Sequence, residues 1–243
     1  MNKPSLSISI VSHGQGSLIE PLLKDLSVAD LSAFSEVKVI VTLNIPENEG
    51  FLSASDLKSH VIRNLRPRGF GANHNQAFAY SECDYFLVLN PDIRLSSFSF
   101  RKLLGANEEH FGVLSPMVIS PTGKVEDSVR RYPSVFRILK RFMLSKRIPD
   151  YLKGSQNVIS VDWIAGMFML FPRESFKRVC GFDTSYFMYL EDADICRRLN
   201  QCGLPVLYNF NQKVIHDAQR SSFKNRQHLK WHLRSMVRFI FGV

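Results

Sequence analysis

The amino-terminal part of the chain alternates apolar runs with segments of helical pattern, and this alternation restricts the fold more than any other feature. Four runs have the length and β-branched content of buried strands: LSISIVS (6–12), VKVIVTL (37–43), HVIRN (60–64) and YFLVLN (85–90). Helices are predicted near 18–28, 72–82 and 98–105. Strands that alternate with helices in this way pair in parallel, so the sequence predicts an α/β fold with a Rossmann-like sheet flanked by helices.

The remainder of the chain predicts a mixed continuation of this sheet. A strand is expected in GVLSPMVIS (112–120), and a turn follows it at Pro121–Gly123. Four further elements complete the pattern: strands around 158–171 and 205–215, and helices around 173–179 and 192–202. A chain of 243 residues, of which 45% are hydrophobic, can bury these elements around one large core.

Carboxylates are concentrated where the last of these helices begins. The apolar segment Met188–Leu190 is followed at once by Glu191, Asp192 and Asp194 in the first helical turn. One or two acids there would serve as capping groups and would compensate the helix dipole. Because three acids, with Asp183 a few residues upstream, exceed that need, we expect at least one of them to have a functional role.

Another acid follows a buried strand. The run 85–89 is continuously apolar, and Asn90, Pro91 and Asp92 end it. In open α/β sheets, ligands bind beyond the carboxyl ends of the strands, where a carboxylate can hold a hard cation and its phosphates. A simple strand-terminating turn is the alternative. The acidic group at 191–194 favours the functional interpretation of Asp92.

The segment Asn64–Asn75 (NLRPRGFGANHN) joins a predicted strand to a predicted helix. Its glycines and the helix amino terminus can offer unpaired N–H groups to a phosphate, and Arg66 and Arg68 add positive charge. The spacing matches neither the dinucleotide fingerprint nor the P-loop. The alternative is an ordinary loop with two solvated arginines.

Several short motifs, in this order, are together specific. They are SIVSHG (9–14), Asn64–Asn75, LNPD (89–92), WIAGM (163–167), GFD (181–183), EDAD (191–194) and Ile215–His216. Over nearly the whole chain, this series resembles the inverting, nucleotide-sugar-dependent glycosyltransferases of family 2, which have the GT-A fold. Within that family it is most similar to bacterial rhamnosyltransferases of O-antigen and related polysaccharide assembly.

The resemblance implies roles for residues of this chain. Asp192 would be the catalytic base, beside Glu191, and Asp92 and His216 would hold a divalent metal, Mn2+ or Mg2+, at the donor diphosphate. An inverting transfer requires one base and one electrophile for the leaving group, which agrees with two separate acidic sites. For His216, a strand histidine hydrogen-bonded to Asp217 or to backbone is the alternative.

The remaining site residues also follow from the resemblance. Donor-binding residues would be Ser12, His13, Asn44, Gly69, Gly71, Asn75, Asn90 and Asp92. Acceptor-binding residues would be Trp163, Gly166 and Asp183. The implied organisation is a GT-A domain at 1–222, divided into a nucleotide-sugar half at 1–120 and an acceptor half at 121–222, followed by a basic amphipathic helix at 223–243.

Basic charge is concentrated in two segments. The chain carries 31 Lys+Arg against 22 Asp+Glu, a net charge of +9. In Arg130–Arg147, basic and apolar residues interleave. At the carboxyl end, basic residues recur every four positions beside an apolar stripe: Arg226, Lys230, Arg234 and Arg238, with Leu229, Leu233, Val237 and Ile240. Such helices can lie on an anionic bilayer, and packing against the domain is the alternative. No nucleic-acid-binding motif is present, so no nucleic-acid partner is expected.

The sequence thus predicts an enzyme of polysaccharide assembly. We expect transfer of a sugar, with rhamnose favoured, from a nucleotide sugar such as dTDP-rhamnose to a hydroxyl of a polyprenyl-diphosphate-linked saccharide. The four cysteines have no CxxC spacing, and neither a signal-peptide pattern nor a membrane-spanning apolar run is visible. We therefore expect a cytoplasmic protein, peripheral on the cytoplasmic face of the inner membrane. The alternative is an inactive GT-A-like protein that binds a sugar nucleotide or a partner, because Asn90 stands where many relatives have an acid.

Overall fold

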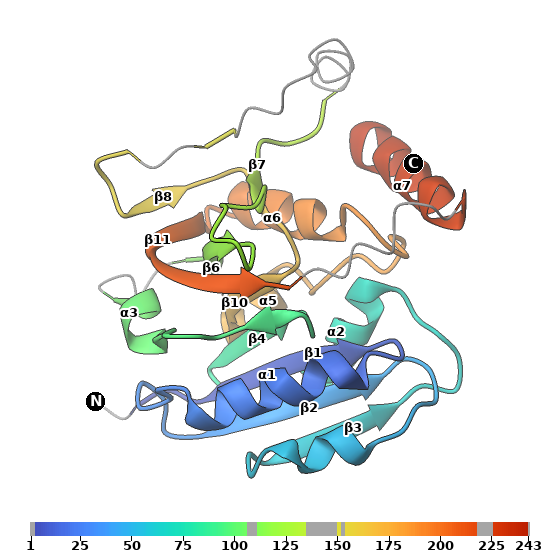
Figure 1. Cartoon of the computed structure of the whole chain (residues 1–243). Helices are drawn as coiled ribbons and strands as arrows, with labels where there is room; N and C mark the ends of the chain where they lie inside the picture. The colour runs from blue at the N-terminus through green and yellow to red at the C-terminus, as the bar shows by residue number, and fades with distance from the viewer. Residues whose placement is uncertain (1–2, 106–110, 135–149, 152–153, 218–225, 243) are drawn as a thin grey trace.

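A computed structural model describes residues 3–105, 111–134, 150–151, 154–217 and 226–242. The described chain forms a nine-stranded mixed sheet with helices packed on both of its faces (Figure 1), and a separate two-stranded sheet. The predicted α/β fold is confirmed. The basic segment predicted at 130–147 falls largely outside the described residues.

The amino-terminal half supplies four parallel strands in the order β3-β2-β1-β4. These are β1 (Leu6–Ser12), β2 (Val37–Leu43), β3 (Ser59–Arg63) and β4 (Tyr85–Leu89). The helices between them are α1 (Gly16–Val28), the short 3-10 helix η1 (Gly50–Ala54) and α2 (Phe70–Ala79). The four predicted strands are present, within one residue of the expected bounds. β1 and β4 are buried along nearly their whole length, whereas the edge strand β3 is largely exposed. The 3-10 helix was not predicted.

The carboxyl-terminal half extends the sheet with mixed strand directions. β10 (Phe168–Pro172) lies antiparallel between β4 and β6 (Val113–Ile119), and β11 (Val206–His216) runs parallel to β6. Two short strands, β5 (Ile93–Arg94) and β8 (Val158–Ser160), pair with β11, while β7 (Val129–Arg130) pairs with β9 (Trp163–Ile164). The remaining helices are α3 (Phe100–Leu104), α5 (Arg173–Arg178), α6 (Glu191–Gln201) and α7 (Arg226–Phe241).

Strand structure is expected around 158–171, and the chain forms three short strands there, β8, β9 and β10. The backbone turns sharply before β10, where the N–H of Met167 donates to the carbonyl of Ala165 (2.8 Å). The Gly166 N–H points instead to a side chain, that of Asp192 (3.0 Å). The break in the strand therefore places a backbone donor at the start of α6.

Side chains alternate across the sheet and form two separate cores. On β4, Leu87 and Leu89 belong to the core under α1, and Phe86 and Val88 to the core under α2, α5 and α6. In the second core the ring of Phe176 contacts several others, with centroids within 5.6 Å: Phe78, Phe86, Phe171 and Phe182. These contacts attach α5 and α2 to the same face, which also carries α6.

The third acid of the 191–194 group is a structural anchor of α6. Asp194 is buried, and its carboxylate accepts hydrogen bonds from Arg197 (3.1 Å) and Arg198 (2.7 Å). Arg198 also donates to the carbonyl oxygens of Val179 and Gly181, which lie just after α5. A buried carboxylate with two guanidinium partners ties α6 to the end of α5, so its role is in the fold.

We expect Asp194→Asn to destabilise the protein by about 3–5 kcal/mol, because it leaves Arg198 partly buried without its counter-charge. Chemical denaturation monitored by circular dichroism measures this loss. The control is Glu174→Gln, which removes an exposed ion pair with Lys177 and should change stability by less than about 1 kcal/mol. Equal stability of the two variants would contradict the anchoring role.

Candidate functional site

The predicted donor-side residues follow the carboxyl ends of the parallel strands. Ser12 ends β1, Asn44 follows β2, Asn64 follows β3, and Asn90 follows β4. This edge of a parallel sheet is where α/β proteins bind their ligands. The fold therefore gathers side chains that are far apart in the sequence at one end of the sheet.

Asn44 fixes the loop that precedes α2. Its Oδ1 accepts hydrogen bonds from the backbone N–H of Arg68 (2.8 Å) and from Asn64 Nδ2 (2.9 Å). Its Nδ2 donates to the carbonyl of Arg68 (3.0 Å) and lies 3.3 Å from Nδ1 of His13. The Asn44 amide is thus used to hold the loop, while the His13 ring is exposed at the same edge.

The two glycines of this loop make close packing contacts. A Cβ on Gly69 would lie 2.4 Å from the carbonyl oxygen of Phe187, and a Cβ on Gly71 would lie 2.5 Å from Cβ of Phe182. Asn75 continues the contact, because its amide donates to the Phe182 carbonyl (2.8 Å) and accepts from the Phe182 N–H (2.9 Å). These three residues join α2 to the segment before α6. Their predicted contacts with the donor stay a prediction.

Asp92, His216 and Glu126 form a chain of hydrogen-bonded side chains. His216 Nε2 lies 3.1 Å from Oδ2 of Asp92, and His216 Nδ1 lies 2.6 Å from Oε2 of Glu126. The register of β5 with β11 pairs His216 with Ile93 and thereby places the histidine beside Asp92. The alternative expectation, a hydrogen bond from the His216 ring to Asp217 or to backbone, is wrong, because both ring nitrogens face carboxylates.

Sequence reasoning missed Glu126. After the turn at Pro121–Gly123, the chain folds back so that the Glu126 N–H donates to the carbonyl of Val118 in β6 (2.9 Å). β6 is paired with β11, and Ile119 lies opposite Ile215, the neighbour of His216. The turn was recognised in the sequence, but Glu126 could be linked to His216 only with the strand register known.

The two carboxylates control the protonation of His216. Burial of the ring lowers its pKa, whereas the hydrogen bonds and charges of Asp92 and Glu126 raise it, with a net result of about 9. The histidine is therefore protonated at neutral pH in the metal-free protein. Loss of that proton would make Nε2 available as a ligand, with Glu126 orienting the ring through Nδ1.

The chemistry of this group fits a divalent metal held by few protein ligands. Oδ1 of Asp92 is buried and has no hydrogen-bond partner among the described residues. No three His, Cys, Asp or Glu side chains within the described part of the chain are arranged to hold a metal ion by themselves. Mn2+ or Mg2+ at a diphosphate takes one or two protein ligands and fills its other positions with phosphate and water, so Asp92 and His216 suffice.

Asp192 lies at the first turn of α6 and accepts two backbone hydrogen bonds. Its Oδ2 accepts from Gly166 N–H (3.0 Å) and its Oδ1 from Ala193 N–H (2.8 Å). The two residues before the helix, Tyr189 and Leu190, both have left-handed backbone, with φ of 71° and 66°. Such conformations are costly for residues with side chains and cluster at functional sites, here at the entry to the carboxylate pair.

The neighbouring Glu191 is almost fully buried, with 5% of its surface exposed. Its Oε2 has no hydrogen-bond partner in the described structure. Burial, followed by the negative charge of Asp192, raises the pKa of Glu191 well above its ordinary value. Burial also raises the pKa of Asp192 to about 6, and the two backbone N–H donors limit that rise. Asp192 therefore changes its protonation state close to neutral pH, as a general base requires.

Strand pairing connects the Asn90–Asp92 turn to Asp192. The N–H of Asn90 donates to the carbonyl of Met167 (3.0 Å), beside the pairing of Leu89 with Phe168 in β4 and β10. Gly166, next to Met167, donates to Asp192. One antiparallel strand pair thus links the Asn90–Asp92 turn to the start of α6.

The three predicted acceptor residues differ in their surroundings. Gly166 bonds Asp192, and a Cβ there would lie 2.9 Å from the ring of Phe70. Trp163 is buried, and its indole N–H donates to the carbonyl of Arg131 (3.1 Å). Asp183 accepts from the backbone N–H of Ser185 (2.9 Å) and pairs with Arg238 of α7 at 3.3 Å. Of the three, Gly166 is the one with a hydrogen bond to Asp192 among the described residues, and acceptor binding by all three stays a prediction.

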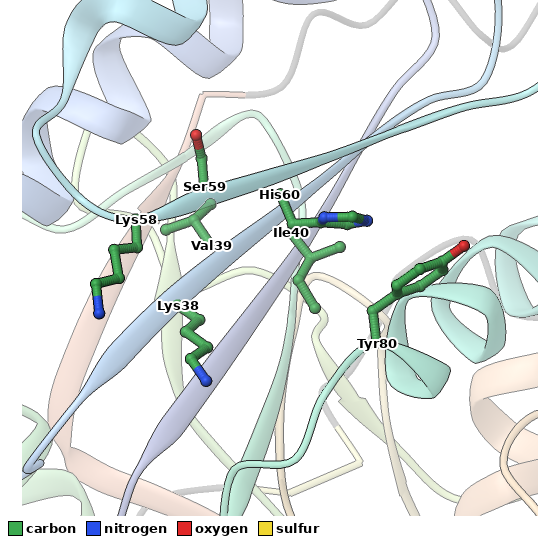
Figure 2. A pocket seen from close by; sticks show the side chains of 7 residues that line it. All are labelled: Lys38, Val39, Ile40, Lys58, Ser59, His60 and Tyr80. Atoms are coloured by element: carbon green, nitrogen blue, oxygen red, sulfur yellow. The ribbon is translucent and has the colours of Figure 1, made fainter.

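A separate cavity of about 120 Å3 lies elsewhere on the sheet, between β2, β3 and the end of α2. Figure 2 shows its lining, with the rings of His60 and Tyr80 side by side and stacked at 4.6 Å, and the side chains of Lys38 and Lys58 apart from them. It lies at the amino-terminal ends of β2 and β3, the opposite end of the sheet from Asp92 and Asp192. Its position excludes it from the chemistry of the site described above.

The order and directions of the strands in this mixed sheet, with helices on both faces, correspond to the GT-A class of glycosyltransferases. Solved structures of this class share the fold. They include GalNAc-T7 with UDP, GalNAc and Mn2+ (TM-score 0.70, 16% identity, covering 91% of this chain and 45% of that chain). They also include the mannosyltransferase PcManGT of Pyrobaculum calidifontis with GDP-Man and Mn2+ (TM-score 0.61, 17% identity, 98% and 65%).

Comparison with curated proteins identifies the family. Rhamnosyltransferase WbbL of Escherichia coli (strain K12) is 33% identical over 253 residues, which cover 96% of this chain and 91% of that protein. The N-acetylglucosaminyl-diphospho-decaprenol L-rhamnosyltransferase of Mycobacterium tuberculosis (strain ATCC 25618 / H37Rv) is 31% identical over 170 residues, 65% of this chain and 55% of that protein. No family model matches the sequence. The chain belongs to the rhamnosyltransferases of glycosyltransferase family 2.

We expect Glu126→Gln to lower the pKa of His216 toward its ordinary value, because one of two facing charges is lost. NMR titration of the ring protons in metal-free protein measures the shift. A histidine whose pKa is raised stabilises the fold fully below about 6.5 and loses that contribution as pH rises through about 9. The loss of unfolding free energy over this window should therefore be smaller in Glu126→Gln. The control is Glu82→Gln, which changes an exposed acid and should leave the His216 titration as in the wild type. A wild-type His216 titration in Glu126→Gln would contradict the assignment.

Proposed function

We propose that the protein is an inverting glycosyltransferase that uses Asp192 as its base and binds the donor diphosphate through a metal at Asp92 and His216. The observation that carries this proposal is the strand pairing that links the Asn90–Asp92 turn to Asp192. Asn90, two residues from Asp92, bonds Met167, and the adjacent Gly166 bonds Asp192. Separate groups for the nucleophile and for the leaving group are what a single displacement needs.

On the donor side, the chain would contribute the side chains that hold the metal and the loop that borders the nucleotide. A divalent metal bound there would neutralise the charge that develops on the departing nucleoside diphosphate. Asp92 and His216 would hold it, and Glu126 would keep the His216 ring oriented with Nε2 toward Asp92. The loop 64–69, fixed by Asn44, and the amino terminus of α2 would border the nucleotide.

On the acceptor side, Asp192 would take the proton of the attacking hydroxyl while that oxygen bonds to the anomeric carbon and the bond to the diphosphate breaks. Both Asp192 oxygens accept one backbone N–H each, which fixes the carboxylate and leaves further lone pairs for the acceptor hydroxyl. Glu191, buried beside it with a raised pKa, would remain protonated and spare Asp192 a second negative charge.

The names of the relatives support the choice of substrates. One is an N-acetylglucosaminyl-diphospho-decaprenol L-rhamnosyltransferase, and the other is a rhamnosyltransferase of similar length to this chain. We infer that the donor is a nucleotide-activated rhamnose, with dTDP-rhamnose favoured. The acceptor would be a saccharide on a polyprenyl diphosphate, in bacterial surface polysaccharide assembly.

Asp192→Asn should reduce turnover by about 10²- to 10⁴-fold, because the base is lost. Donor affinity, measured by calorimetry with Mn2+ and dTDP-rhamnose, should stay within about twofold. The wild-type kcat/KM should fall as pH drops through about 6, because Asp192 then becomes protonated. Replacing a carboxyl whose burial disfavours its charge should keep or raise Tm at neutral pH.

The matched control is Asp56→Asn, which changes an exposed acid outside the site and should leave turnover and its pH profile unchanged. An inactive binding protein would give no transfer with any variant, although it would still bind the sugar nucleotide. Turnover that survives in Asp192→Asn would assign the base to another residue.

We further propose that α7 places the enzyme on an anionic membrane surface. The helix uses one face for packing, where Phe239 and Ser235 are buried, and leaves an apolar stripe outward: Leu229, Leu233, Val237 and Phe241, each between 48% and 66% exposed. The helix lies beside α6, and Arg197 donates to the carbonyl of Phe239 (2.9 Å) (Figure 1). In the described part of the chain, no helix has both the length and the apolar content to span a bilayer.

Leu229→Gln with Leu233→Gln should weaken binding to phosphatidylglycerol vesicles by about tenfold or more, because two side chains no longer enter the acyl boundary. Co-sedimentation measures the partition. Since both residues are exposed, Tm should not change. The control is Val28→Gln, an exposed apolar residue at the end of α1. Unaltered partition of the double variant would refute membrane docking by this stripe.

A further inference from the structure

A pocket of about 190 Å3 lies between α7 and the segment that precedes the catalytic helix. It is lined by Ser185, Phe187, Trp231, Arg234, Ser235 and Arg238. None of these residues belongs to the metal position or to the carboxylate pair. The pocket combines two guanidinium groups with an aromatic wall, and the reaction described above uses neither.

The aromatic wall consists of Phe187 and Trp231. Their ring centroids are 4.7 Å apart with planes inclined by 35°, and Phe187 keeps 38% of its surface exposed. A hydrogen bond fixes the spacing of the two elements that carry these rings. Ser235 Oγ donates to the carbonyl of Met188 (2.9 Å), so α7 and the 185–188 segment keep a fixed distance. A fixed, partly exposed aromatic face suits the apolar face of a sugar or the first units of a lipid chain.

The positive charge of the pocket is only partly neutralised. Arg238 uses Nε and Nη2 toward Oδ2 of Asp183, at 3.4 and 3.3 Å, and Nη1 is not part of that contact. Arg234 is exposed and forms no ion pair with any residue that the structure describes. Arg234 and Arg238 lie one helical turn apart, and Asp183 pairs with Arg238 alone of these two. The pocket therefore keeps a net positive charge. Arginine forks bind phosphate oxygens in pairs, which gives them geometric specificity for a diphosphate.

The pocket lining is linked to Asp192 through three residues that contact one another in turn: Phe187, Phe70 and Gly166. The carbonyl of Phe187 accepts a hydrogen bond from the N–H of Phe70 (3.0 Å). The ring of Phe70 packs on Gly166, and Gly166 donates to Asp192. The chain also leads directly from Phe187 to Glu191 in four residues. The pocket lining is therefore in contact with residues that hold Asp192 in place.

We propose that this pocket binds the diphosphate of the acceptor, with Arg234 and Arg238 as its ligands and the Phe187–Trp231 stack against the group attached to it. The proposal rests on the proposed function, because it assumes a diphosphate-linked acceptor. It gives Arg234 and Arg238 a role distinct from that of the outward apolar stripe of the same helix. The saccharide end of such an acceptor would extend toward Asp192 and the lipid end toward the stripe.

The same chemistry could come from a phospholipid headgroup or from the diphosphate of the donor, so binding is measured first without metal. Inorganic pyrophosphate, dodecyl diphosphate, dTDP and phosphatidylglycerol vesicles are titrated in EDTA, with tryptophan emission as the signal. The chain contains two tryptophans. Trp231→Phe therefore identifies the part of the signal that comes from the pocket. We expect saturation with pyrophosphate and tighter binding of dodecyl diphosphate.

Arg234→Ala should weaken dodecyl diphosphate binding by about tenfold or more, the cost of one charge-assisted contact. Arg238→Lys should weaken it while preserving the charge beside Asp183, in case removal of Arg238 impairs folding. Lys230→Ala is the matched control, because it removes one exposed basic charge from the same helix outside the pocket. Equal affinity of Arg234→Ala and Lys230→Ala would overturn the proposal. So would a Trp231 response to dTDP alone, or a response to the vesicles that persists in Leu229→Gln with Leu233→Gln.

Kinetics then separate this pocket from the proposed function. Two acceptors are compared, dodecyl N-acetylglucosaminyl diphosphate and the neutral dodecyl N-acetylglucosaminide. Arg234→Ala should raise KM for the diphosphate acceptor by about tenfold and leave KM for the donor and for the neutral acceptor unchanged. An equal rise for both acceptors would overturn the diphosphate assignment. If the wild-type enzyme uses neither acceptor, the proposed acceptor class fails, whereas the dodecyl diphosphate titration still decides the pocket.

Discussion

The insertion of β10 between β4 and β6 is the constraint on which the remaining architecture depends. Without this antiparallel strand, the four parallel strands would end at β4, and nothing would place the acidic helix near the Asn90–Asp92 turn. The pairing of Phe168 with Leu89 fixes the position of Met167 and Gly166. Because a shift of one residue in a strand reverses the direction of every side chain, this register is strongly specified by the buried apolar faces of both strands. The geometry of the site is therefore a consequence of core packing.

The carboxylates of this protein show how surroundings separate chemically similar groups. Asp194 is buried with two arginines and serves the fold. Glu191 is buried without a cation and has a raised pKa, whereas Asp192 keeps two backbone donors and a pKa of about 6. Asp92 and Glu126 each face one ring nitrogen of His216. Burial raises the pKa of Glu191 and Asp192, and the two carboxylates differ in the backbone donors that face them.

The parts of this structure that were predictable from sequence are those set by local pattern. The parallel strands follow from apolar runs, and α6 from the acids and apolar positions at its start. The site residues implied by the family resemblance include Asn44, Asn90 and Asp92, which follow the carboxyl ends of parallel strands. Long-range pairing was not visible: Glu126 reaches His216 only through the β6–β11 register, and β7 and β9 are too short to have a pattern. The amphipathic pattern of α7 also left its orientation open, because basic and apolar stripes can each face the domain. Contacts of Phe239, Ser235 and Arg238 decide it.

The close approach of Gly69 and Gly71 to the 182–187 segment has a mechanical consequence. Any Cβ added to Gly69 would touch the backbone of Phe187, and any Cβ added to Gly71 would touch Cβ of Phe182. At this seam the 69–71 segment and the 182–187 segment therefore pack without flexible side chains between them. A seam of this kind resists hinge bending, because small rotations would produce hard contacts. A displacement of the loop 64–69, where the donor is proposed to bind, would then be transmitted to the segment that leads to Tyr189 and Leu190. If both substrates bind as proposed, occupancy of one position would alter the shape of the other, which would provide a route to ordered binding.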